Sequence, residues 1–352
     1  MRSLSQKTLR RVNRWKLVAL LTVLVGAIVL ILSVENLLFS SLVGFVVAYM
    51  LGPIVNFLER KGLSRTVSAA MTFLFTGSLL VLVGFWVAPY LGNTLYSLKE
   101  DMPRFIVGVG QFISDMEARV RSIAGPLSTF DLTTKVESYL TTWTNHFFDS
   151  LPRFLRTTVT VMLLGPFLAF FMVKDGRILA RGVLGLVPNH LFEAALSLLH
   201  QINVQIGQFV RARILESFIV GLVTASGLLI ISYPYAALLG IVAGLTNLVP
   251  YLGPILGAVP AFLIAAVNHY SSLDIAAVAS VYIVAQLIDA GFLIPLMVAK
   301  IVDLHPVTVI IVMIAGAQIL GVLGVILSIP VASTLKVTFT TAYRHLIDTR
   351  TN

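Results

Sequence analysis

One ionisable side chain lies deep inside a long apolar run in the last third of the chain. Asp289 is about 16 positions into the run Leu273–Val298, and Gln286 precedes it by three residues. A carboxylate embedded in a membrane segment is costly, and it usually marks an ion or proton pathway. The alternative is a purely structural ion pair, for which Arg213 is the candidate partner. We therefore place Asp289 first among the candidate residues and keep both interpretations.

Three further polar side chains, Asn247, Tyr251 and Gln318, flank sites where apolar helices must be interrupted. Broken helices expose backbone carbonyl and amide groups, which can bind ions or polar solutes where protein or water lines them. The alternative is that these side chains only satisfy the freed backbone groups. With Asp289 and Gln286 they form the predicted substrate or ion pathway. Glu216, three residues after Arg213, lies closer to the end of its run and is interpreted as structural.

Other kinds of chemistry have no basis in the sequence. The chain has no cysteine, so disulfides, thiol catalysis and thiolate metal sites are excluded. Its six histidines are scattered, and HExxH, GxSxG, P-loop and dinucleotide-binding motifs do not occur. We expect a protein that is not an enzyme and that holds no metal and no cofactor, apart from H⁺ or Na⁺ as a coupling ion.

Composition points to the lipid bilayer as the partner that surrounds these residues. Hydrophobic residues make up 57% of the 352 residues and charged residues only 12%, whereas soluble domains carry about 25% charged residues. The net charge of +9 does not indicate nucleic-acid binding, because no aromatic-studded basic groove is evident. Instead, six basic residues between Arg2 and Lys16 precede the first apolar run and predict a cytoplasmic N-terminus.

About eight hydrophobic elements follow one another, which predicts an all-α polytopic membrane protein. They cover residues 17–34, 37–58, 67–91, 154–173, 214–231, 235–267, 273–298 and 306–337. Most have the roughly 20 residues that a bilayer-spanning helix requires. The basic residues near the C-terminus predict that this end is cytoplasmic too, so we expect the protein in the cytoplasmic membrane.

Residues 93–153 differ from the rest because they carry seven acidic and six basic residues. Two apolar stripes with spacings of three and four, Leu95–Met116 and Leu132–Phe154, predict an antiparallel helical hairpin outside the membrane. The stripes either pack only on each other or also mediate contacts between subunits of a homo-oligomer. This segment divides the chain into 1–92, 93–153, 154–213 and the predicted transport core 214–352.

Two of the elements are too long to be single straight spans. Residues 235–267 and 306–337 would measure about 50 and 48 Å as helices, against a hydrocarbon core of about 30 Å. Prolines and glycines interrupt both elements: Pro250, Gly253, Pro254 and Gly257 in the first, and Gly321, Gly324 and Pro330 in the second. Each element is therefore either a re-entrant hairpin or one kinked span. As hairpins they would form an inverted repeat, a recurring transporter design.

Several motifs are similar to those of a known family. The most specific is Asn247–Gly257, which reads NLVPYLGPILG, and Lys174–Gly176 and Leu304–Pro306 support it. Over nearly the whole chain the sequence resembles the autoinducer-2 exporter family of PerM-like bacterial membrane proteins. The resemblance implies export of a small signalling molecule or sodium(lithium)/proton antiport, often by homo-oligomers.

We therefore expect a secondary transporter, either an exporter or an antiporter, that carries a small solute or ion through the two broken elements. Two alternatives from other classes stay open. One is an oligomeric channel that needs no alternating access, and the other is a membrane scaffold that binds partners through residues 93–153.

Overall fold

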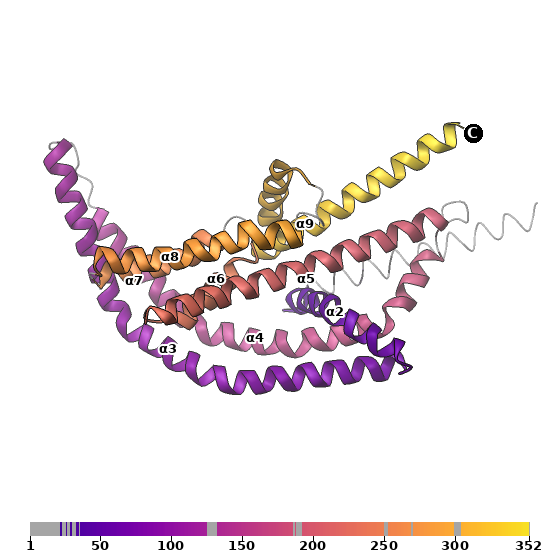
Figure 1. Ribbon diagram of the computed structural model, residues 1–352, viewed down its shortest axis with the longest axis horizontal. Helices are drawn as coiled ribbons and strands as arrows, with labels where there is room; N and C mark the ends of the chain where they lie inside the picture. Colours follow the sequence, from indigo (N-terminus) through magenta and orange to yellow (C-terminus); the bar gives the residue numbers. More distant parts are fainter. Residues whose placement is uncertain are drawn as a thin grey trace, which may run out of the picture. The chain divides into compact units, whose positions relative to one another are not determined.

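The computed structural model describes residues 36–124, 132–185, 192–249, 253–268, 270–298 and 304–351, together with a few isolated positions before residue 36 and Val187. In these ranges the elements are helices (Figure 1): α2 (Leu37–Arg60), α3 (Arg65–Ala124), α4 (Leu132–Leu184), α5 (Phe192–Ile230), α6 (Ala236–Thr246), α7 (Gly253–Val267), α8 (Ser272–Ile288), η2 (Asp289–Val298) and α9 (Pro306–Thr351). The predicted first span, 17–34, lies almost entirely outside the described residues.

Helix length and composition confirm the all-α membrane class. Five helices of the described chain are long and apolar enough to cross a bilayer. On α3 the side chains of Phe75, Phe85 and Trp86 are 73–78% exposed. Contiguous exposure of large apolar side chains would be a liability in water, and lipid is the solvent that suits it.

The chain forms two compact units. The first contains residues 1–78, 153–201 and 341–352, and the second contains residues 79–152 and 202–340. In the first unit, Gly44 of α2 packs directly on the backbone of α4 at Gly165, where neither position has room for a side chain. Val55, Ala69 and Val173 form a small buried cluster that joins α2, α3 and α4.

One end of this first unit is held by ionic contacts. The Arg65 Nε donates to the backbone oxygens of Val173 and Lys174 at 2.9 and 3.0 Å. Glu59 accepts from Arg65 and from Arg177, at 3.1 and 2.8 Å. The helix α4 runs on past this contact to Leu184, so the charged residues that end the fourth apolar run do not end the helix.

The end of α3 and the beginning of α4 pair in an antiparallel manner within the second unit. Glu117 of α3 accepts hydrogen bonds from the backbone of Leu132 and the hydroxyl of Thr133 at the start of α4. Further along, Thr144 of α4 contacts the sulfur of Met102. The helix α3 continues without a break from the third apolar run into this pair, because hydropathy marks where a membrane would end and not where a helix must end. The location of the pair outside the membrane stays a prediction.

The first broken element is a pair of short antiparallel helices, α6 and α7. The helix α6 ends at Thr246 and α7 begins at Gly253, so the interruption falls where prolines and glycines predict it. Tyr233 before α6 and Val267 at the end of α7 share one buried cluster, whereas Gly253 packs on Asn247 at the other end. Both ends of the element therefore lie together, and Asn247 and Gly253 lie at its tip.

The second broken element also reverses direction, inside the range assigned to α9. Gly321 has φ +59°, in the left-handed region that glycine adopts without strain. On either side of it, Gly316 and Gly324 are in backbone contact, although eight residues of straight helix would separate them by about 12 Å. The structure thus contains two helical hairpins. Their entry into a membrane from opposite faces stays a prediction.

Candidate functional site

Three charged side chains meet inside the second unit. Arg213 and Glu216 come from α5, and Asp289 comes from the point where α8 passes into η2. Their exposed fractions are 6%, 0% and 4%. The Arg213 Nη1 donates to the Glu216 Oε1 at 2.7 Å, and the carboxyl groups of Glu216 and Asp289 are close enough to interact. We call these three residues the charged cluster.

The charged cluster is tied to the tip of the first hairpin. The helix α6 ends at Thr246, so its last carbonyl groups have no partner within the helix and carry partial negative charge. The Arg213 guanidinium donates to two of the backbone oxygens there, those of Asn247 and Leu248. A single side chain therefore links the hairpin tip to Glu216, whose carboxyl group in turn lies close to that of Asp289.

Several polar atoms around the cluster are buried without a partner in the part of the chain that the structure describes. They include the Glu216 Oε2, the Asp289 Oδ1, the Ser217 Oγ and the Asn247 Nδ2. A buried polar atom without a hydrogen bond is costly, and each such atom needs an explanation, for example an ion or a water molecule. Two carboxylate oxygens in this state can accept a proton or coordinate a small cation.

The backbone changes at Asp289. It follows the last residue of the regular helix α8 and begins η2, a π-helix of 10 residues. π-helical turns are rare, and they occur frequently at functional sites. The local widening of the helix coincides with the buried carboxylate that the sequence singles out.

The second hairpin lies beside the same part of α5. Phe209, one turn before Arg213, is buried with Val309 and Ile329 from the two arms of this hairpin. Val249, from the tip of the first hairpin, packs on the same group. The two broken elements therefore approach each other close to the charged cluster.

The structure brings together only some of the residues predicted for the pathway. Asp289 is in the cluster, and the buried Asn247 adjoins it through its backbone oxygen. Gln286 and Gln318 are exposed on the surface of the described chain. Tyr251 and Pro250 lie outside the described residues. The role of all five pathway residues stays a prediction.

The structure describes all of the predicted hinge residues except Pro250. Gly253 and Gly257 pack against the end of α6, and Gly324 packs against Gly316. Gly321 provides the turn of the second hairpin, and Pro330 is buried near Phe209. Pro254 belongs to the first turn of α7, where proline is tolerated because the first helical amides have no partner in the helix.

The sequence alone does not identify two members of the charged cluster as site residues. It indicates a structural role for Glu216 and a role for Arg213 only as a partner of Asp289, yet Glu216 is the least exposed of the three. The available signal was the spacing of three residues, which places Arg213 and Glu216 on one face of α5 directly before the first broken element. Hydropathy alone could not show that this face points inward.

Known proteins are similar to this chain over most of its length. The sequence model described as AI-2E family transporter matches residues 17–344. YueF of Bacillus subtilis, named as a transport protein, is 26% identical over 88% of this chain and 85% of its own length. PerM of Escherichia coli K12, named as a permease, is 26% identical over 93% of both chains. MJ1177 of Methanocaldococcus jannaschii, also named as a transport protein, is 24% identical over 84% of this chain and 87% of its own length.

Proposed function

The chain belongs to the AI-2E family of membrane transporters, and we propose that it is a secondary transporter whose coupling ion, H⁺ or Na⁺, binds at the charged cluster. The solute is small, and the two hairpins form its path. We further propose that the protein works as an exporter or as an antiporter, in line with its resemblance to the autoinducer-2 exporters.

The observation that carries this proposal is the charge balance of the cluster. One guanidinium and two carboxylates leave a net charge of −1 when all three are ionised, and all three residues are at least 94% buried. A buried charge without compensation is strongly unfavourable. Uptake of one monovalent cation, either a proton or Na⁺, would neutralise the site, and its unpartnered Glu216 and Asp289 oxygens are the atoms that would receive it.

The hydrogen bonds of Arg213 couple ion binding at the carboxylates to movement of the hairpin tip. Arg213 divides its donors between Glu216 and the hairpin tip. When a cation or proton binds the carboxylates, the attraction of Glu216 for Arg213 weakens. The contact that holds the tip then changes, and the tip can open or close the path between the hairpins. Discontinuous helices whose ends meet ions near the bilayer centre are a known basis of alternating access.

An oligomeric channel and a sodium(lithium)/proton antiporter without export of a signalling molecule are the competing functions. A channel would need an open path, whereas the charged cluster is closed by the side chains around it. This favours a carrier. We further propose a location in the bacterial inner membrane with both termini in the cytoplasm, and assembly as a homo-oligomer, which the exposed Tyr139 and Trp143 on α4 support.

Reconstitution into proteoliposomes tests the proposal. A panel of small solutes is offered under an imposed pH gradient, an imposed Na⁺ gradient or neither. We expect flux that saturates with solute concentration and responds to one of the two gradients. Asp289→Asn, which removes the charge at nearly constant shape, is expected to abolish the gradient dependence.

The matched control is Asp274→Asn, because Asp274 is on the same helix but is exposed and only caps its N-terminus. It should behave like the unmodified protein. Conductance that rises linearly with voltage and does not saturate would instead identify a channel. A folded protein that moves no solute and no ion would contradict transport altogether.

A further inference from the structure

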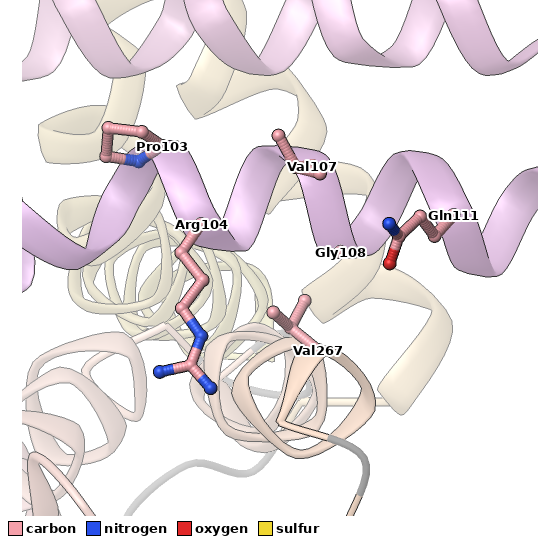
Figure 2. A pocket seen from close by; sticks show the side chains of 6 residues that line it. All are labelled: Pro103, Arg104, Val107, Gly108, Gln111 and Val267. Carbon is pink, nitrogen blue, oxygen red and sulfur yellow. The ribbon is translucent and has the colours of Figure 1, made fainter.

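Two pockets that share Arg104 lie at the open end of the first hairpin, where α3 passes the end of α7. We treat them together as the two lobes of one cleft. The first lobe, about 440 Å³, is lined by Pro103, Val107, Gly108, Gln111 and Val267 as well as Arg104. Figure 2 shows the Arg104 side chain extending from its helix toward the helix that carries Val267. Apart from Arg104 and Gln111, the lining of this lobe is apolar.

The second lobe, about 380 Å³, has a different lining. Asp101, Arg104, Tyr235, Asn268 and Tyr270 contribute polar groups, and Phe105 and Pro234 complete it. Both lobes fall in the range of roughly 300–1,000 Å³ that is usual for small-molecule sites. The cleft is distinct from the charged cluster, since it lies at the open end of the hairpin and the cluster lies at the tip.

The two charges of the second lobe remain available to a ligand. Asp101 accepts the hydroxyl of Tyr235 with its Oδ2, which leaves its Oδ1 to accept another donor. Arg104 makes no ion pair with any residue in the described ranges. Because Asp101 and Arg104 are three residues apart on α3, they lie on the same side of that helix, one turn from each other.

The neutral groups of this lobe favour a cation beside Asp101. The amide nitrogen of Asn268 already donates to the backbone oxygen of Ile264 at 3.0 Å, so its oxygen is the group that it offers. The Tyr235 ring stands edge-on to Phe105, with 6.5 Å between the ring centroids. Aromatic rings and a carboxylate together bind ammonium groups well.

We propose that this cleft binds a zwitterionic amino acid with an apolar side chain. Its carboxylate pairs with Arg104, whose planar fork fits a carboxylate in a bidentate manner. Its ammonium group lies in the second lobe, against Asp101 and the tyrosine rings. Its side chain lies in the first lobe, against the exposed Val107. An ion of a single sign would use only one of the two charges, and an apolar solute would use neither.

The test is equilibrium binding of L-leucine to the purified full chain, with two analogues that each lack one charge. The analogue 4-methylpentanoate lacks the ammonium group, and 3-methylbutylamine lacks the carboxylate. We expect leucine to bind at least about tenfold more tightly than either analogue, because each analogue leaves one charged group of the cleft without its hydrogen-bond partner.

The variants separate the two charges. Arg104→Gln should weaken leucine to the level of 3-methylbutylamine and leave the amine unchanged. Asp101→Asn, which keeps an oxygen to accept the Tyr235 hydroxyl, should make leucine and 4-methylpentanoate equal. Arg119→Gln is the matched control, since Arg119 is exposed on the same helix and does not line either lobe. Circular dichroism establishes that each variant is folded.

The proposal is overturned if either analogue binds the folded protein as tightly as leucine does. It is equally overturned if alanine, valine, leucine and phenylalanine all fail to bind. This measurement needs no gradient and no flux, so its outcome is separate from that of the proteoliposome experiment.

Discussion

At the scale of single residues, Arg213 is the counterion of the buried Glu216 carboxylate. It donates to Glu216 and to the oxygens of Asn247 and Leu248. Removal of one partner of a buried ion pair costs about 3–5 kcal/mol, because the other charge is left without compensation. Arg213→Gln should therefore lower the unfolding temperature strongly, as measured by thermal unfolding in detergent.

The double variant Arg213→Gln/Glu216→Gln provides the control, because it removes one positive and one negative charge together. It should unfold at a higher temperature than Arg213→Gln alone. If the double variant is less stable than the single one, Arg213 does not act as the counterion of Glu216.

The sequence predicted part of this site, for a physical reason. Asp289 and Asn247 are conspicuous because they interrupt long apolar runs. Glu216 lies equally far inside the structure, but near the beginning of its run, where a charge can also reach the membrane surface. Hydropathy therefore cannot distinguish a buried Glu216 from a Glu216 at the membrane surface. The approach of Glu216 to Asp289, 73 positions later in the chain, depends on tertiary packing.

At the scale of elements, glycines allow the first hairpin to pack closely against α5. A Cβ on Gly244 would lie 2.9 Å from the backbone oxygen of Ser217, and one on Gly221 would lie 3.0 Å from that of Gly240. Small residues of this kind let helix backbones approach closely. Gly244→Ala should therefore force the helices apart and destabilise the fold by about 1–3 kcal/mol.

The matched control for this change is Gly84→Ala, within α3, because nothing lies within 4 Å of a Cβ at that position. It should leave the unfolding temperature unchanged or raise it slightly, since alanine favours a helix more than glycine does. If Gly244→Ala and Gly84→Ala lower the unfolding temperature equally, the close contact between α5 and α6 does not contribute to stability.

The broken elements were predictable, because their length and their proline and glycine content leave no straight helix as a solution. The continuity of α3 over 60 residues was not predictable from the sequence. Pro103 and the charged residues after residue 92 mark a change from an apolar to a polar environment, but the helix continues through them. The reversal at Gly321 was visible only as one glycine among several, and its positive φ identifies which of them makes the turn.

At the scale of the whole molecule, the re-entrant interpretation makes a prediction about sidedness. If α6 and α7 enter and leave the membrane on one face, Ser232 before them and Ser272 after them lie on the same side. The chain contains no cysteine, so Ser232→Cys and Ser272→Cys can be labelled one at a time in intact cells with an impermeant thiol reagent. Both should react from outside.

Ser64→Cys, in the basic link between α2 and α3, should react only after the membrane is opened, because that link is predicted to be cytoplasmic. All three serines are exposed in the structure. Labelling of Ser232→Cys and Ser272→Cys from opposite sides would establish one kinked span and contradict the inverted pair of hairpins.

The central claim, that the charged cluster takes up one monovalent cation, can be measured without knowledge of the solute. Unfolding temperatures are recorded over a pH series, and over a Na⁺ series in which choline keeps the ionic strength constant. An ion that binds only the folded state stabilises it, by about 2.7 kcal/mol when its concentration is 100-fold above Kd. The unmodified protein and Asp274→Asn should show the same dependence on H⁺ or Na⁺, and Asp289→Asn should lose it. If Asp289→Asn keeps the full dependence, the ion binds elsewhere and the account of the cluster is wrong.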